Sequence, residues 1–140
     1  YFARYSGVAR WIEQTRIDAR KNGYVKTLLG HMRFLPDIAA KNTSVRSFAE
    51  RIAINSPVQG TSAEIIKYAM IHVVRSISEQ KISARLLLQV HDDLLFEVED
   101  GVVDQFIPLL RTCMEGAMKL SVPLAVSMQK GRNWADMEKV

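Results

Sequence analysis

The change of hydrophobic spacing after Lys81 constrains the fold more than any other feature of the chain. Before it, apolar residues recur at helical spacing: Ile65, Ile66, Ala69, Met70, Val73 and Ile77. After it, two apolar runs, 85–90 and 94–98, are separated only by His91-Asp92-Asp93. Apolar runs joined by so few polar residues are typical of a β-hairpin. The sequence therefore predicts a helix followed by a tight hairpin over 85–98.

Two further helices and a small hairpin are predicted in the first part of the chain. One helix covers about 7–22, with Ser6 as its N-cap and Gly23 as its terminating residue. β-forming residues around a glycine predict a small hairpin near 24–35. A second helix, about 42–55, follows.

Prolines make two helix boundaries uncertain. The helix that carries the apolar stripe begins at Ser56-Pro57 or one turn later at Thr61, because each position begins a capping box. Its continuity with the preceding helix stays open, since a proline inside a helix costs about 3 kcal/mol. A last helix, about 102–119, contains Pro108, and we expect a kink there.

Together these elements predict an α+β fold. A small antiparallel sheet, formed by the hairpin 85–98 and a strand at 124–128, packs against several helices, with the small hairpin near 24–35. A length of 140 residues suits one compact domain, and the single cysteine, Cys113, excludes a disulfide scaffold. No apolar run approaches the roughly 18 residues that a membrane span needs.

The net charge of +4 hides a division of the chain. Residues 1–85 carry a balance of +8, and residues 86–140 carry a balance of −4. A basic part suits a polyanion, and an acidic part that opens with adjacent carboxylates suits a cation. Ordinary solvated surface charge is the alternative explanation.

The adjacent acids Asp92 and Asp93 are the most informative pair in the chain. Like charges held close together are unfavourable unless a cation lies beside them. Mg²⁺ prefers oxygen ligands and commonly takes one or two protein carboxylates with water and substrate phosphates. The pair therefore indicates a magnesium site, with a solvated polar turn as the alternative.

A second set of polar residues recurs every four positions, at Arg51, Asn55 and Gln59. On a continuous helix they share a face and present a guanidinium and two amides. These groups can donate hydrogen bonds to phosphates, sugars or minor-groove acceptors. A plain polar helix face explains the same spacing.

Read together, these segments resemble family A DNA polymerases, the bacterial DNA polymerase I type. The resemblance rests on two gapless blocks, 49–67 and 88–98, and it includes 23–38 and the closing residues 122–134. It therefore covers nearly the whole chain, in the order found at the C-terminal end of such enzymes.

The resemblance implies both an organisation and an activity. Residues 1–41 correspond to a fingers-side helix and hairpin, and residues 42–140 to a palm segment, with the upstream polymerase regions missing. The implied reaction adds deoxynucleotides to a primer 3′-end by two-metal phosphoryl transfer. The implied partners are primer-template DNA and deoxynucleoside triphosphates, without a membrane. The full-length enzyme is expected to be monomeric and to work in the cytoplasm of a bacterial or phage-infected cell, or in an organelle.

The resemblance also implies roles for individual residues. Asp92 binds the two catalytic Mg²⁺ ions, with Asp93 beside it, and the remaining ligand comes from the missing upstream palm strand. His91 lies near the primer terminus. Because metal ligands are missing, we expect the 140 residues alone to be inactive.

The implied DNA contacts lie on two elements. Arg51, Asn55 and Gln59 correspond to residues near the primer-template minor groove, and Arg33 to a duplex contact. The chain departs from the family twice: Asp93 replaces the usual Glu, and His31-Met32 stand where the family often has arginines.

Two other functions are compatible with parts of the sequence. A His-Asp pair also marks the all-helical HD-type metal-dependent phosphohydrolases, in which His31, His72 and His91 would be ligands. A non-catalytic module that binds duplex DNA is the other alternative. A hairpin at 85–98 would exclude the first, and duplex binding that survives loss of Asp92 would favour the second.

Overall fold

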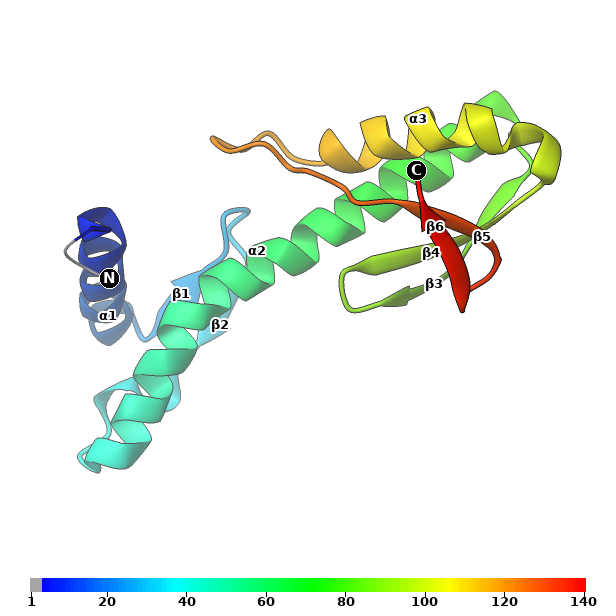
Figure 1. Cartoon of the computed structure of the whole chain (residues 1–140). Coiled ribbons are helices and arrows are strands. Elements are labelled where there is room, and N and C mark those ends of the chain that lie inside the picture. Colours follow the sequence, from blue (N-terminus) through cyan, green and yellow to red (C-terminus); the bar gives the residue numbers. More distant parts are fainter. Residues whose placement is uncertain (1–3) are drawn as a thin grey trace. The chain divides into compact units, whose positions relative to one another are not determined.

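The computed structural model describes residues 4–140 and contains helices and small antiparallel hairpins (Figure 1), which confirms the predicted α+β class. The chain forms two compact units, one up to Glu64 and one from Ile65 onward. The long helix α2 (Thr43–Gln80) contributes residues to both units. The strands form separate two-stranded sheets, so the predicted third strand does not join the 85–98 hairpin.

The first unit is built around the N-terminal part of α2. Its other elements are α1 (Ser6–Asn22), β1 (Tyr24–Lys26), β2 (Met32–Phe34) and a 3-10 helix (Pro36–Ala39). Helix α1 ends as predicted, because Gly23 adopts the left-handed conformation with φ of 75°. The prediction of Ser6 as N-cap is wrong by one residue: the backbone carbonyl of Tyr5 accepts the first helical bonds, from Val8 and Ala9.

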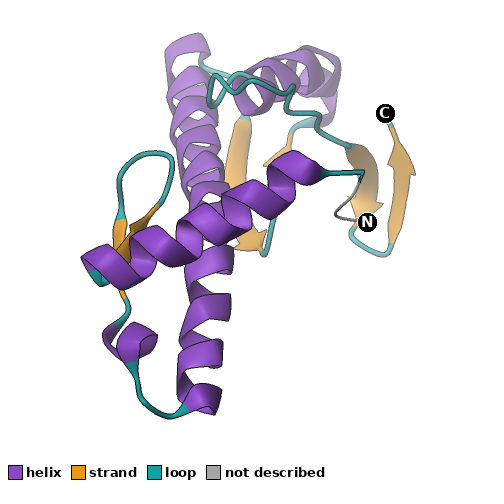
Figure 2. Cartoon of the chain, turned by 90° about the vertical axis from the view of Figure 1, so that its left-hand side faces the viewer, coloured by secondary structure: helices purple, strands orange, loops and turns teal. Residues whose placement is uncertain are grey.

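Small side chains let α1 approach α2 in this unit. Ala19 of α1 and Ala49 and Ala53 of α2 belong to one buried cluster, which Val25, Leu35 and Ile38 complete. In Figure 2, α1 crosses in front of α2, with the β1–β2 hairpin beside it. Burial of these apolar groups holds the hairpin and both helices together.

Helix α2 is continuous over 38 residues although Pro57 lies inside it. Pro57 has no N–H to donate to the carbonyl of Ala53. Nearby hydroxyls bond to neighbouring carbonyls: Ser56 Oγ donates to Ile52 O at 2.7 Å, and Thr61 Oγ1 donates to Pro57 O at 2.6 Å. Ala53 and Ser56 are also buried. Tertiary packing thus outweighs the helix-breaking tendency of the proline.

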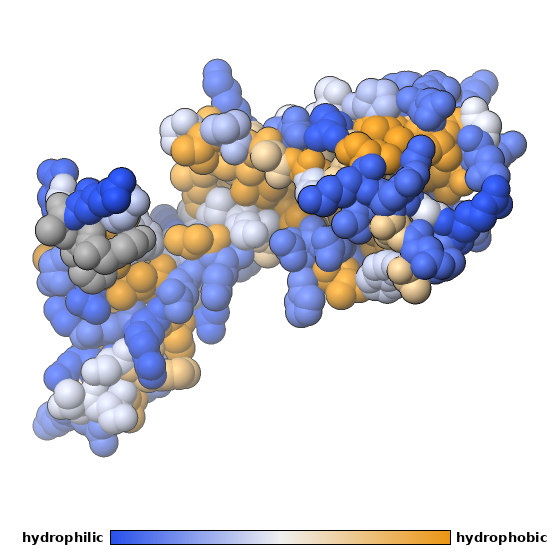
Figure 3. All heavy atoms as spheres, viewed as in Figure 1, coloured by the Kyte–Doolittle hydropathy of each residue, from blue (hydrophilic) through white to orange (hydrophobic). Residues whose placement is uncertain are grey.

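The second unit contains the remaining helix and two hairpins. Its elements after α2 are β3 (Ala84–Val90), β4 (Asp93–Val98), a 3-10 turn (Asp100–Val102), α3 (Val103–Glu115), β5 (Gln129–Asn133) and β6 (Asp136–Lys139). Val73, Ile82 and Phe106 form its buried centre, and Phe96 meets Phe106 edge to face with ring centroids 5.3 Å apart. Apolar side chains also gather at the surface over α3, among hydrophilic ones (Figure 3).

The predicted strand at 124–128 is wrong. Both backbone groups of Val126 are bound by side chains of α3: its N–H donates to Glu115 Oε1 at 3.1 Å, and its carbonyl accepts from Arg111 Nη1 at 3.0 Å. They are therefore not available for a β-ladder. The strands β5 and β6 follow this segment instead. Helix α3 ends at Glu115, earlier than the predicted 119.

Candidate functional site: the β3–β4 tip and the α2 face

The β3–β4 hairpin has a two-residue turn. Val90 pairs with Asp93, so only His91 and Asp92 form the turn, where three residues were predicted. His91 adopts a positive φ of 56°, which hairpin turns of this length require at their first position. The side chain of Gln89 braces the turn by donating to the His91 carbonyl at 2.8 Å.

A β-bulge explains the shorter turn. The register shifts between Leu86 and Leu88, which leaves Leu87 as an extra residue on β3. Without that shift, the ladder would close at Gln89 opposite Asp93 and leave three residues in the turn. The bulge therefore brings Val90 into the ladder opposite Asp93 and leaves only His91 and Asp92 in the turn.

The two acids are both exposed but occupy different positions. Because side chains alternate along a strand, Asp93 lies on the opposite face of β4 from Phe96, which packs in the core. Glu97 shares the face of Asp93, and Arg85 Nη2 lies 2.6 Å from its Oε2. The tip thus presents two solvent-accessible carboxylates, with no basic partner recorded for either among residues 4–140.

Carboxylate oxygens are suitable ligands for Mg²⁺, and two of them fit the small number of protein carboxylates that this ion commonly takes. Within the described chain, however, no three His, Cys, Asp or Glu side chains gather into a group able to hold a metal ion. The tip therefore supplies carboxylate donors that suit part of a magnesium site, and binding of the ion by Asp92 and Asp93 stays a prediction.

The face predicted on α2 exists because the helix continues through Pro57. Arg51, Asn55 and Gln59 are all exposed and follow one another at intervals of four residues on the same helix. The guanidinium of Arg51 lies 5.7 Å from the ring centroid of Phe48. This contact leaves the hydrogen-bond donors of Arg51 free to face a ligand.

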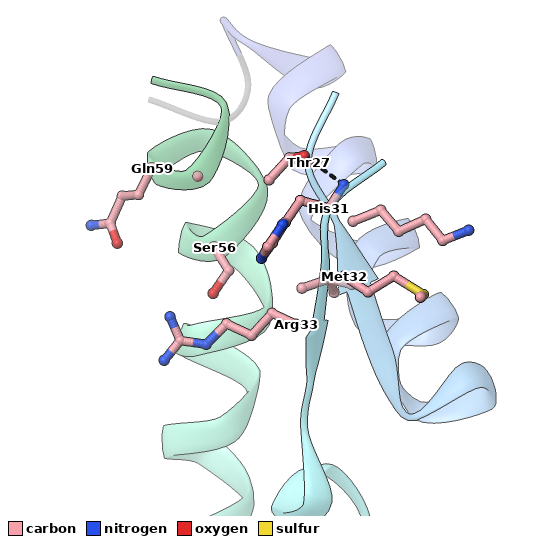
Figure 4. Close-up of a pocket in the computed structure, with 9 residues that line it drawn as sticks. Thr27, His31, Met32, Arg33, Ser56 and Gln59 are labelled. Atoms are coloured by element: carbon pink, nitrogen blue, oxygen red, sulfur yellow. Dashed lines mark hydrogen bonds between the residues drawn. The ribbon is translucent and has the colours of Figure 1, made fainter. Parts of the chain in front are cut away.

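A cavity of about 260 Å³ lies between the β1–β2 hairpin and α2. It brings together two predicted DNA-binding residues, Arg33 and Gln59, and adds Lys26, His31 and Ser56. In Figure 4 the His31 ring and the Arg33 side chain extend from the hairpin toward the α2 turn that holds Ser56, whereas the Gln59 amide points outward from α2. The cavity is thus bordered by cationic and hydrogen-bonding groups.

From the sequence, His31 is named only as a departure from the family and as a ligand in the HD-type alternative, and Lys26 is not named as a site residue. The signal that would have found both is the position of the turn: Lys26 pairs with Met32 at the turn end of the hairpin, and His31 directly precedes Met32. The predicted residues thus form two groups: Arg33, Arg51, Asn55 and Gln59 in the first unit, and His91, Asp92 and Asp93 in the second.

The HD-type alternative is wrong. His91 and Asp92 form the turn of an antiparallel hairpin, not part of an all-helical site. None of the three histidines belongs to a group of three possible metal ligands in the part of the chain that the structure describes. Among the described helices, none combines the length and apolar character needed to span a bilayer.

Known proteins match nearly the whole chain. The family model "DNA polymerase family A" matches residues 1–136. DNA polymerase I of Mycobacterium tuberculosis is 47% identical over 134 residues, which are 96% of this chain and 15% of that protein. DNA polymerase I of Geobacillus stearothermophilus is 45% identical over 136 residues, 97% of this chain and 16% of that protein.

A solved structure agrees with these relatives. It is described as the POL domain of Pol1 from M. smegmatis in complex with DNA primer-template and dNTP. The TM-score is 0.86 at 46% sequence identity, and the match covers 89% of this chain and 22% of the other. The chain therefore spans about a sixth of the length of its curated relatives and about a fifth of the solved chain.

Proposed function

The chain belongs to DNA polymerase family A, and we propose that it is the C-terminal part of a template-directed DNA polymerase, in which residues 1–41 lie on the fingers side and residues 42–140 in the palm. The observation that carries the proposal is the hairpin tip, where Asp92 and Asp93 stand exposed at the end of two paired strands. The proposed reaction is attack of a primer 3′-hydroxyl on the α-phosphate of a deoxynucleoside triphosphate.

In this proposal Asp92 holds magnesium, and Asp93 lies beside it as a second carboxylate. When bound, paired Mg²⁺ ions stabilise the attacking and leaving oxygens of such a displacement. The remaining protein ligand comes from a palm strand outside this chain, because the described residues supply no group of three ligands. For the same reason, residues 1–140 alone are expected to be inactive.

The proposed DNA contacts belong to the first unit. Arg51, Asn55 and Gln59 present hydrogen-bond donors from one face of α2, and the acceptors of the minor groove are nearly the same for every Watson–Crick pair. Such contacts can sense the shape of a base pair without reading its identity. Arg33 supplies a positive charge for the phosphate backbone, and His91 at the turn is proposed to lie near the primer terminus.

The proposed partners are primer-template DNA and deoxynucleoside triphosphates. The solved relative is described in complex with both, and the chain has a net charge of +4 that its basic first part accounts for. The named relatives are bacterial, which supports a site of action in a bacterial cytoplasm.

The test is primer extension by the polymerase chain that contains this segment. Asp92→Ala should abolish nucleotide incorporation and leave primer-template binding largely unchanged. The control is Asp104→Ala, an exposed acid in the first turn of α3, which should retain incorporation. Incorporation within a few-fold of wild type in Asp92→Ala would refute the metal role. Duplex binding by a wild-type chain that never extends a primer would favour the non-catalytic binding module.

A further inference from the structure

The turn between β1 and β2 is joined to α2 by a hydroxyl relay through Thr27. The backbone N–H of His31 donates to Thr27 Oγ1 at 3.0 Å, and this hydroxyl donates to Glu64 Oε1 at 2.8 Å. Figure 4 marks the first of these bonds. The hydroxyl thus accepts from the turn and donates to the helix, so the position of the His31 backbone depends on Glu64.

A second relay repeats this pattern through Thr61. The backbone N–H of Leu28 donates to Thr61 Oγ1 at 2.9 Å, and that hydroxyl donates to the carbonyl of Pro57 at 2.6 Å. Here the threonine belongs to the helix, whereas Thr27 belongs to the hairpin. Two parallel relays therefore fix two backbone N–H groups of one turn to one helix.

The packing around Thr27 leaves little freedom. A Cβ built on Gly60 would lie 2.5 Å from Thr27 Cγ2, so the hairpin touches α2 where the helix has no side chain. Glu64 Oε2 is buried without a hydrogen-bond partner among the described residues, which leaves the Thr27 hydroxyl as the recorded partner of this carboxylate. A buried polar atom without a partner is costly, so loss of the Thr27 hydroxyl would leave both oxygens of Glu64 without a recorded partner among residues 4–140.

The fixed turn leads directly into the strand that carries Arg33. Arg33 lines the same cavity as Gln59, which lies on α2 between Pro57 and Thr61. We propose that Thr27 and Thr61 are positioning residues, which hold the hairpin against α2 so that Arg33 and Gln59 contact the same DNA duplex. This inference rests on the proposed DNA-binding function of those two residues.

The test uses the polymerase chain that contains this segment, with matched variants of each threonine. Thr27→Val and Thr61→Val keep the shape of the side chain and remove the hydroxyl, whereas Thr27→Ser and Thr61→Ser keep the hydroxyl. Each valine variant loses both hydrogen bonds of its hydroxyl and should raise the Kd for primer-template DNA about two- to tenfold. The kcat at saturating DNA should stay unchanged, and the serine variants should bind as wild type does.

A double-variant cycle separates positioning from general weakening of the fold. If Thr27 acts through Arg33, the effect of Thr27→Val on the Kd should shrink in an Arg33→Ala background. An undiminished effect in that background would overturn the inference, as would valine variants that bind duplex as tightly as wild type.

Hydrogen exchange distinguishes failure of the inference from failure of the proposed function. The amides of His31 and Leu28 should exchange faster in the respective valine variants, with or without DNA. Faster exchange together with unchanged duplex binding would overturn the positioning role and leave the polymerase assignment intact. A wild-type chain that shows these amides protected yet does not bind primer-template DNA would refute the proposed function itself.

Discussion

Arg20 Nη2 donates a hydrogen bond of 2.6 Å to Oε1 of Glu50 and thereby links α1 to α2. The Glu50 side chain is 15% exposed, and Arg16 Nε lies 3.9 Å from its other oxygen. The hydrogen bond from Arg20 lowers the pKa of Glu50 below its ordinary value of 4.5, although desolvation opposes the shift. The same bond raises the pKa of Arg20.

This pair predicts a dependence of local stability on pH. Because the folded-state pKa of Glu50 is lowered, its stabilising contribution is fully present above about pH 4.5 and is lost as the pH falls through the lowered value. Glu50→Gln should therefore reduce the hydrogen-exchange protection of α1 near pH 7, and the difference from wild type should shrink in acid. Glu13→Gln is the control, since Glu13 is 60% exposed in its 3.5 Å contact with Arg16. A difference that is equal at both pH values would contradict the prediction.

Arg51 and Gln59 are predicted to make minor-groove hydrogen bonds whose strength depends on the geometry of the terminal base pair. Arg51→Ala or Gln59→Ala should slow extension of matched and mismatched primer termini to different degrees, because a lost minor-groove hydrogen bond, worth about 0.5–3 kcal/mol, depends on the shape of the pair. Single-turnover extension of both primer types measures the ratio. Arg75→Ala, an exposed cation on α2, should leave that ratio unchanged. An equal loss of extension rate on both primers would mean that the two residues only position the duplex and do not respond to the shape of the base pair.

Asp93→Glu should be tolerated. Asp93 is exposed at the first position of β4, so one additional methylene meets solvent and not the core. We expect kcat and the KM for the nucleotide within a few-fold of wild type, whereas Asp93→Asn should impair turnover more, because it removes a charge near the proposed metal. An inactive Asp93→Glu variant with intact folding would mean that the tip requires the shorter acid.

Gly60→Ala should destabilise the contact between the β1–β2 hairpin and α2. The added methyl would overlap Cγ2 of Thr27, whose hydroxyl is held by two hydrogen bonds, and such overpacking costs typically about 1–3 kcal/mol. Thr27→Ser removes that methyl and keeps the hydroxyl. The double variant Gly60→Ala with Thr27→Ser should regain the lost stability, measured by urea unfolding or by exchange of the Leu28 amide. A double variant as unstable as Gly60→Ala alone would exclude this clash as the cause.

Sequence patterns predicted the elements whose signals are local. Gly23 ends α1 because it adopts the left-handed conformation at low cost, and the hairpin over 85–98 follows from two apolar runs around polar residues. Spacing and charge also singled out Arg51 on α2 and Asp92 at the hairpin tip as candidate site residues, and the family resemblance supplied their roles. Their exposure is consistent with the proposed roles.

Long-range packing decided what the sequence left open or got wrong. Propensity alone argues against a helix through Pro57, yet buried Ala53 and Ser56 keep α2 continuous. The apolar segment 124–128 has the composition of a strand, but side chains of Arg111 and Glu115 bind its backbone. Neither contact can be recognised from the hydrophobic pattern of the local sequence, because each depends on residues that the fold brings together.

The extra residue at Leu87 changes the direction in which the end of the hairpin is aimed. Ala84 packs on the interior, but after the bulge Leu88 and Val90 lie on the outer face with Asp93. The base of the hairpin therefore packs on the core, whereas the bend at the bulge sets the direction of the tip. Removing Leu87 would leave a regular ladder with the same two-residue turn, and both acids would remain. The direction of their side chains would differ, because the strand would no longer bend. The orientation of Asp92 and Asp93 therefore depends on Leu87, which precedes Asp92 by five residues.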